Sequence, residues 1–149
     1  MDTKLKADIA EAAVTTELLK RGFRVLQPVG DRLPYDLAVD FNGALMRVQI
    51  KSAWFDRSKN MYAVDVRRTK TNRRHMIRAR YGHDDFDFAV LYIEELNVFY
   101  VMPSIVFNDF GSTISLVETV KRQRKPRASD YRGRWDLLSL WAPQRATSE

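Results

Sequence analysis

The sequence contains no cysteine, and that absence excludes two kinds of stabilising site. Without thiols there is no disulfide framework and no thiolate that could hold a metal ion. Histidine is scarce as well, with two residues in 149. A structural zinc site takes about four ligands, drawn mainly from these two residue types. Any bound metal is therefore expected to be a hard cation held by oxygen ligands.

Long apolar runs are also missing from the chain. No stretch approaches the roughly 18 consecutive apolar residues that a membrane helix requires. The first residues, Met1 to Lys6, alternate charged and apolar side chains and lack the apolar segment of a signal peptide. We expect a soluble, cytoplasmic protein with no membrane partner.

Positive charge is in excess. The chain has 25 Lys and Arg against 19 Asp and Glu, which gives a formal net charge of +6 and a pI near 9.7. A basic protein attracts polyanions, so nucleic acid is the usual partner, although binders of anionic membranes share this property. The length favours one domain over residues 1–149 with a core of its own. A basic C-terminal extension is expected from about residue 118 onward.

Hydrophobic periodicity predicts a mixture of helices and strands. A helix is expected over residues 4–21, because apolar side chains recur there at helical spacing and Gly22 follows as a C-terminal cap. A last helix is expected from Ser129 or Asp130 to Leu140. Strands are predicted over residues 23–26, 35–41, 44–51, 61–66, 88–93, 98–102 and 113–117. The fold class is therefore α/β (α+β mixed), with a mixed sheet of four to five strands flanked by helices.

A hairpin is the sharpest local prediction. Asn42-Gly43 lies between two alternating runs, and this pair is the strongest short signal for a two-residue turn with positive φ. With that turn as the register, the apolar side chains of both strands share the core face. On the other face Asp36 stands opposite Gln49, and Lys51 points the same way.

The polar face of this hairpin could carry chemistry. Opposed Cβ atoms lie roughly 4.5–5.5 Å apart, so the Asp36 carboxylate and the Gln49 amide oxygen could share one divalent cation. A cation with a lysine beside it is what phosphodiester hydrolysis requires, since both stabilise charge on the phosphate. The alternative is an ordinary solvated face, because half-exposed strands normally turn polar residues outward.

The spacing of these residues also resembles the signature of a known nuclease superfamily. Pro34-Tyr35-Asp36 is followed after twelve residues by Gln49-Ile50-Lys51, which is similar to the PD-(D/E)XK motif. Flanking segments resemble the same superfamily, and the resemblance spans roughly Glu11 to Pro103. Within it, the chain looks most like the bacterial homing endonucleases that group I introns encode and that use the restriction-enzyme fold.

The resemblance implies a restriction-endonuclease-like core and Mg²⁺-dependent cleavage of double-stranded DNA, with Mn²⁺ able to substitute. Asp36 matches the metal-binding aspartate of the motif and Lys51 matches its catalytic lysine. Glu11 matches an additional acidic ligand found in many members. Gln49 occupies the position of the second acidic residue, which is a departure because an amide supplies a ligand oxygen without charge.

Two other functions remain open from the sequence. A Holliday-junction resolvase would need the same basic surface, and the neutral Gln49 is compatible with a DNA-binding protein of this fold that has lost catalysis. For a nuclease, one chain offers one site. Cutting both strands then requires a homo-oligomer, a dimer or a tetramer.

Two basic segments are candidates for DNA contact, since Lys and Arg bind phosphates and Arg can also read guanine. The first has no acidic residue within it: Arg67, Arg68, Lys70, Asn72, Arg73, Arg74, Arg78 and Arg80. The second segment could equally be a solvated linker: Lys121, Arg122, Arg124 and Lys125.

Two further groups of residues could have either a functional or a purely structural role. His83, Asp84, Asp85 and Asp87 could form a rival metal site, although closely spaced carboxylates more often cap a turn. Trp54-Phe55 follows Lys51 closely, and packing in the core or at the end of a strand is expected there rather than stacking on bases.

Overall fold

The computed structural model describes residues 2–71, 76–79, 85–119 and 125–143, and its first element is the long helix α1 (Thr3–Lys20). The Asp2 side chain caps α1 by accepting the N–H of Lys4 at 2.9 Å. Gly22 follows the last turn with a φ of 85°, the left-handed conformation expected beyond a helix end. Ala10, Val14 and Leu18 form the buried face of α1, whereas Leu5 and Leu19, two of the side chains whose helical spacing predicted the helix, are exposed.

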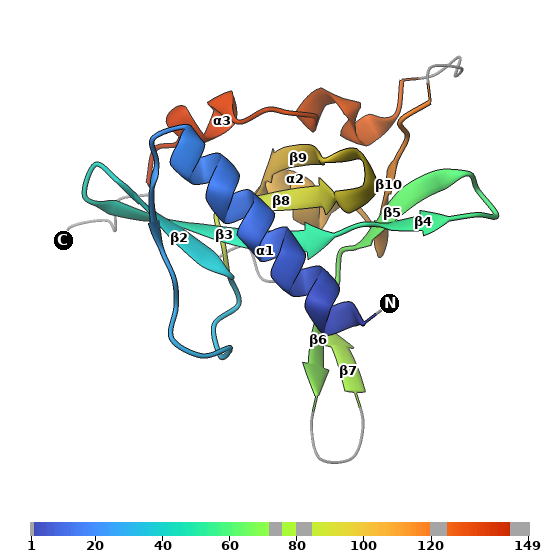
Figure 1. Cartoon of the computed structure of the whole chain (residues 1–149), viewed down its shortest axis with the longest axis horizontal. Helices are drawn as coiled ribbons and strands as arrows, with labels where there is room; N and C mark the ends of the chain where they lie inside the picture. The colour runs from blue at the N-terminus through green and yellow to red at the C-terminus, as the bar shows by residue number, and fades with distance from the viewer. Residues whose placement is uncertain (1, 72–75, 80–84, 120–124, 144–149) are drawn as a thin grey trace.

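A central sheet of five strands lies against α1, in the order β1-β2-β3-β8-β9 (Figure 1). All neighbouring strands in it are antiparallel except β3 and β8, which are parallel. The mixed sheet that the sequence predicted is thus confirmed. Its strands are β1 (Arg24–Leu26), β2 (Leu37–Phe41), β3 (Ala44–Ser52), β8 (Phe88–Ile93) and β9 (Val98–Pro103).

The β2–β3 hairpin has the predicted register. Val39 pairs with Met46 and Leu37 with Val48, across a turn in which Asn42 and Gly43 have φ values of 52° and 87°. The Asp40 carboxylate accepts the N–H of Gly43 at 3.1 Å and braces this turn.

The other face of the central sheet is covered by a second sheet, which the sequence did not reveal as a separate layer. Its order is β10-β5-β4, and the short helix α2 packs on the same side. The elements are β4 (Trp54–Asp56), β5 (Met61–Asp65), β10 (Thr113–Leu116) and α2 (Ser104–Asp109). The central sheet therefore has a hydrophobic cluster on each face.

Because a hydrophobic cluster lies on each face of the central sheet, the alternative expectation that the polar face of the β2–β3 hairpin is solvated is corrected. Ala38 is 4% exposed and Gln49 is 8% exposed. In the parallel ladder Gln49 lies beside Ala89 and Lys51 beside Leu91, and both partners belong to the cluster under the second sheet. The polar residues at the end of β3 thus sit at the rim of a core.

The chain passes from β3 into β4 through the fully buried Ala53, whose N–H donates to the Tyr92 carbonyl at 2.9 Å. Trp54 and Phe55 follow on an edge strand and are 42% and 45% exposed, so neither belongs to the core. Phe55 instead meets Tyr62 edge to face, with ring centroids 5.1 Å apart.

A two-stranded antiparallel ribbon, formed by β6 (Arg68–Thr71) and β7 (Met76–Ala79), leaves the second sheet after β5. Figure 1 shows it projecting away from both larger sheets, below the N-terminal end of α1. We call this element the β6–β7 ribbon. It falls inside the basic segment that the sequence analysis singled out, for which no secondary structure was predicted.

The C-terminal segment contributes to both clusters, through Ala128 on one side and Trp135 and Leu138 on the other. The single final helix predicted from Ser129 or Asp130 is wrong. The region forms the 3-10 turn η2 (Arg127–Tyr131) and then the short helix α3 (Asp136–Ser139). A further 3-10 turn, η1 (Glu94–Leu96), joins β8 to β9. In the described part of the chain, no helix has the length and apolar character needed to cross a membrane.

Candidate active site

The candidate site begins where β3 continues beyond the start of β2. The first residue of β2, Leu37, pairs with Val48 of β3. From Gln49 onward, β3 therefore has no strand partner on the side where β2 lies. Asp36, the residue just before β2, lies at the start of this unpaired edge of β3. Its Oδ2 accepts the N–H of Ile50 at 2.8 Å, and its own N–H donates to the Val48 carbonyl at 2.9 Å. The Asp36 carboxylate is thereby fixed at the open edge of β3.

Glu11 reaches the same place from α1. It follows the buried Ala10, and this small neighbour allows the helix to approach the sheet closely. Glu11 and Asp36 line one pocket of about 220 Å³, together with residues of the loop that precedes β2. Glu11 from α1 and Asp36 just before β2 thus share one pocket, which Asp31 in that loop also lines.

Gln49 is the buried polar residue of the site, at 8% exposure. It lies one residue beyond the last β2–β3 pair, between Val48 and Ile50, the two residues whose main chain bonds to Asp36. Its amide nitrogen donates to the Ile50 carbonyl at a long 3.4 Å. Among the described residues no hydrogen bond reaches its amide oxygen, so that oxygen is available to a ligand.

Lys51 lies two residues further along β3 and is half-buried. Its ammonium donates to the main-chain carbonyl of Arg67 at 3.2 Å, and its positive charge acts on Asp36. Sequence reasoning did not find the Arg67 carbonyl as a partner. A main-chain oxygen has no residue signature, so no sequence signal could have identified it.

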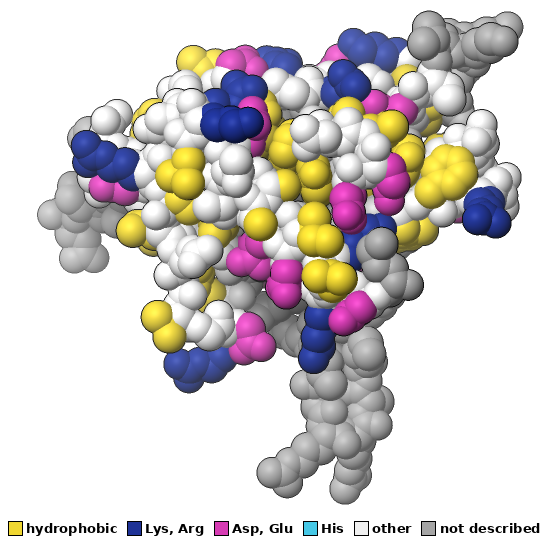
Figure 2. Space-filling view, in the orientation of Figure 1, with side chains coloured by type: hydrophobic (Ala, Val, Ile, Leu, Met, Phe, Trp, Pro, Cys, Tyr) yellow, Lys and Arg dark blue, Asp and Glu magenta, His cyan; other side chains and the backbone are white. Residues whose placement is uncertain are grey.

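The two carboxyl groups carry unfavourable negative charge. Burial raises the pKa of the Glu11 carboxyl above its ordinary 4.5, and the charges of Asp36 and Asp8 raise it further. Burial also raises the pKa of Asp36 above 3.8, while the Ile50 N–H and Lys51 oppose that shift. Figure 2 shows acidic side chains gathered in the middle of the face that α1 crosses. A bound cation would relieve this repulsion.

The oxygen atoms at this site suit a hard divalent cation. Asp36 Oδ1, the Glu11 carboxylate and the Gln49 amide oxygen are oxygen ligands without a hydrogen-bond donor among the described residues. Oxygen ligands of this kind are preferred by Mg²⁺ and Mn²⁺. Among the described residues, no group of three or more His, Cys, Asp and Glu side chains is placed to hold a metal ion.

The rival acidic cluster has a structural role at its described end. The Asp87 carboxylate accepts the N–H of Arg47 at 2.7 Å and pairs with the Arg47 guanidinium at 3.2 Å. Asp87 thus ties the start of β8 to β3. His83 and Asp84 lie outside the described residues.

The candidate DNA-contacting residues fall around the β6–β7 ribbon and near the C-terminal turn. Arg67 is exposed at the root of the ribbon, and Arg68, Lys70 and Arg78 lie on its two strands. Lys125 forms an ion pair with Asp130. The remaining candidates lie outside the described residues: Asn72, Arg73, Arg74, Arg80, Lys121, Arg122 and Arg124.

Comparison with known proteins gives a family match and matches among solved structures. A family described as PD-(D/E)XK endonuclease matches residues 1–138. A solved structure, that of the bacterial homing endonuclease I-Ssp6803I, is similar with a TM-score of 0.86. It is 54% identical to this chain over 93% of each chain. No curated protein sequence matches the chain. Neither match favours a junction resolvase or a DNA-binding protein without catalysis.

Proposed function

Because the chain belongs to the PD-(D/E)XK endonuclease family, we propose that it cuts double-stranded DNA at a specific site as a homing endonuclease. The observation that carries the proposal is the pocket at the open edge of β3. There Asp36 is fixed by the Ile50 N–H, Glu11 faces it from α1, and the Lys51 charge lies beside it.

The proposed cofactor is Mg²⁺, with Mn²⁺ able to replace it. Asp36, Glu11 and Gln49 would hold the ion, since each offers an oxygen that no described donor occupies. When bound, it would polarise the scissile phosphate and make a water molecule a better nucleophile. The raised pKa values of Glu11 and Asp36 support this assignment, because a cation favours the ionised forms that burial disfavours.

Each residue of the chain has a distinct proposed task. The Asp36 and Glu11 carboxylates provide the negative charge of the site, and Gln49 adds a neutral oxygen. The Lys51 ammonium stabilises charge that develops on the phosphate and orients the attacking water. The double cover of the central sheet excludes bulk water behind Gln49, which strengthens these interactions.

The β6–β7 ribbon is the proposed DNA-binding element. The major groove of B-form DNA admits a two-stranded antiparallel ribbon of this kind. Arg67 at the ribbon root lies within hydrogen-bond reach of Lys51 through its main chain, so DNA held by the ribbon would lie next to the site. Its proposed contacts are Arg67, Arg68, Lys70, Asn72, Arg73, Arg74, Arg78 and Arg80, and the second segment adds Lys121, Arg122, Arg124 and Lys125.

A homo-oligomer is part of this proposal. Each chain carries one Asp36 and one Lys51 at the open edge of β3, whereas a duplex has two strands to cut. Two copies related by a two-fold axis would place one site on each strand, and the preferred target would then be partly palindromic.

The proposed activity is tested by incubating the protein with a random-sequence duplex DNA library and Mg²⁺, then capturing and sequencing the cut ends. We expect discrete ends that define one target sequence. Paired ends at a fixed offset would show that both strands are cut. A library that stays intact with both Mg²⁺ and Mn²⁺ would contradict the proposal, and ends without sequence preference would contradict its site specificity.

Replacing Gln49 tests whether its oxygen binds the metal. Gln49→Glu should lower the Mg²⁺ concentration for half-maximal cleavage by about 10-fold, because a charged ligand binds the ion more tightly. Gln49→Ala should raise that concentration by a similar factor. Without metal, Gln49→Glu should melt at a lower temperature than wild type, since it buries an unpaired charge. An unchanged Mg²⁺ dependence in Gln49→Ala would show that Gln49 is not a ligand.

A further inference from the structure

The root of the β6–β7 ribbon is connected directly to Lys51. The Lys51 ammonium donates to the carbonyl of Arg67 at 3.2 Å, and β6 begins at the next residue, Arg68. A lysine side chain has four flexible carbons and loses rotamer entropy when it is fixed. It therefore needs a firmly held acceptor to stay in one place.

The Arg67 carbonyl is such an acceptor, because the residues before it are held from two sides. Val66 is 1% exposed within the cluster under the second sheet, and its N–H donates to the Ser112 carbonyl at 3.0 Å. The Arg67 N–H donates to Asp65 Oδ1 at 2.9 Å. A contact of this kind, from an aspartate to the N–H two residues later, fixes a local turn of the main chain.

We propose that Asp65 is a positioning residue: by fixing the Arg67 main chain, it holds the Lys51 ammonium at the reaction site. The proposal rests on the proposed function of Lys51. It also means that the root of the DNA-binding ribbon and the catalytic lysine are one hydrogen bond apart. The ribbon's position on DNA and the lysine's position in the site are then set together.

The test uses the full chain and a duplex that contains the sequence found at the cut ends. We expect Asp65→Ala to lower the single-turnover cleavage rate by about 10-fold, as is typical when a supporting hydrogen bond of an active site is removed. The Kd for the duplex, measured with Ca²⁺ in place of Mg²⁺, should stay within about 2-fold of wild type. Asp65→Asn keeps the acceptor oxygen and should restore most of the rate.

A matched control is available in the same sheet. Asp56 accepts the N–H of Ser58 at 3.0 Å in the same two-residue geometry, on the β4–β5 side of the molecule. Asp56→Ala should leave both rate and Kd unchanged. If Asp65→Ala does not fold, Asp65→Glu serves in its place. Its longer side chain no longer fits the turn, and the same fall in rate is expected.

Other outcomes overturn the proposal in distinguishable ways. A weaker Kd with an unchanged saturated rate would mean that Asp65 only anchors the ribbon for binding. An unchanged rate in Asp65→Ala, beside an inactive Lys51→Ala, would remove the positioning role and leave the proposed function standing. Full cleavage by Lys51→Ala would instead remove the assigned role of Lys51 and with it the proposed active site.

Discussion

Replacing Asp36 by asparagine should lower DNA cleavage by at least about 100- to 1,000-fold while DNA binding is retained. A metal ion contributes several kcal/mol to stabilising a phosphoryl transition state, and each 1.36 kcal/mol corresponds to about tenfold in rate. Asparagine keeps an oxygen that can accept the Ile50 N–H, so the local structure should persist. The measurement is single-turnover cleavage with Mg²⁺, together with the Kd for the same duplex.

The same variant should be more heat-stable than wild type when metal is absent. Burial raises the pKa of Asp36, which means that its charged form destabilises the folded state. The destabilisation by the charged Asp36 is complete at pH values above its raised pKa. It decreases as the pH falls toward the ordinary aspartate pKa of 3.8. The Tm advantage of Asp36→Asn should therefore be largest near neutral pH and vanish in acid. Adding Mg²⁺ should raise the Tm of wild type alone.

Asp40→Asn is the matched control for this experiment. Asp40 lies at the other end of β2, and its oxygen braces the turn through the Gly43 N–H, which asparagine can also accept. Cleavage by Asp40→Asn should equal that of wild type. If Asp36→Asn cleaves DNA strongly, or if both variants lose cleavage activity equally, the assignment of Asp36 to the catalytic site is wrong.

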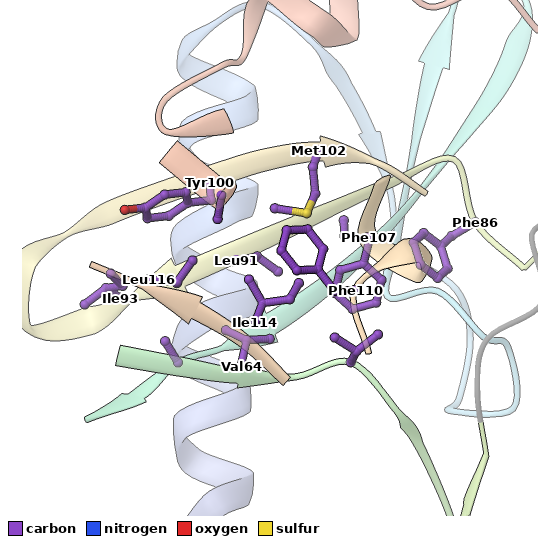
Figure 3. Close-up of a cluster of buried hydrophobic side chains, with 14 residues drawn as sticks. Val64, Phe86, Leu91, Ile93, Tyr100, Met102, Phe107, Phe110, Ile114 and Leu116 are labelled. Atoms are coloured by element: carbon purple, nitrogen blue, oxygen red, sulfur yellow. The ribbon is translucent and has the colours of Figure 1, made fainter. Parts of the chain in front are cut away.

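Replacing Phe107 by alanine should destabilise the fold by about 3–5 kcal/mol, the usual cost of truncating a buried aromatic residue. Phe107 is fully buried on α2, and its ring meets Phe86 edge to face at 5.6 Å (Figure 3). Its removal leaves a cavity between α2 and the second sheet. Equilibrium unfolding in urea, followed by far-UV circular dichroism, measures the loss of free energy of unfolding.

The exposed Phe55 provides the comparison. Its ring also makes one edge-to-face contact, with Tyr62, yet it is 45% exposed. Phe55→Ala should cost less than about 1.5 kcal/mol, because little apolar surface leaves the interior and one aromatic pair is lost. Equal costs for the two variants would mean that the second sheet and α2 do not form a tightly packed core.

The sequence was most informative where a local rule fixes the backbone. Asn42-Gly43 determines the turn, and the turn determines the register, so the pairing of Leu37 with Val48 and the position of Asp36 at the end of that ladder could be derived without a family. The helix α1 followed in the same way from its periodicity and Gly22. In both cases neighbouring residues decide the structure.

Tertiary features were harder to predict. The burial of Gln49 depends on β5 and β10, which pack over β3 from distant positions in the chain. Helical spacing alone could not show whether Glu11 faces the site, because it lies beside the buried stripe of α1 and not in it. The β6–β7 ribbon was missed because its basic sequence has few apolar residues whose alternation would indicate strands.

The parallel pairing of β3 with β8 joins Val48 to Phe88, which are forty residues apart in the chain. The β6–β7 ribbon lies inside this loop and forms a sheet of its own, separate from the five-stranded and three-stranded sheets. The entropy of closing a loop grows only logarithmically with its length, and doubling the length costs about 0.6 kcal/mol. The ribbon can therefore lengthen at little cost in loop-closure entropy, and if it binds DNA as proposed, the target can change without altering the proposed site on β3.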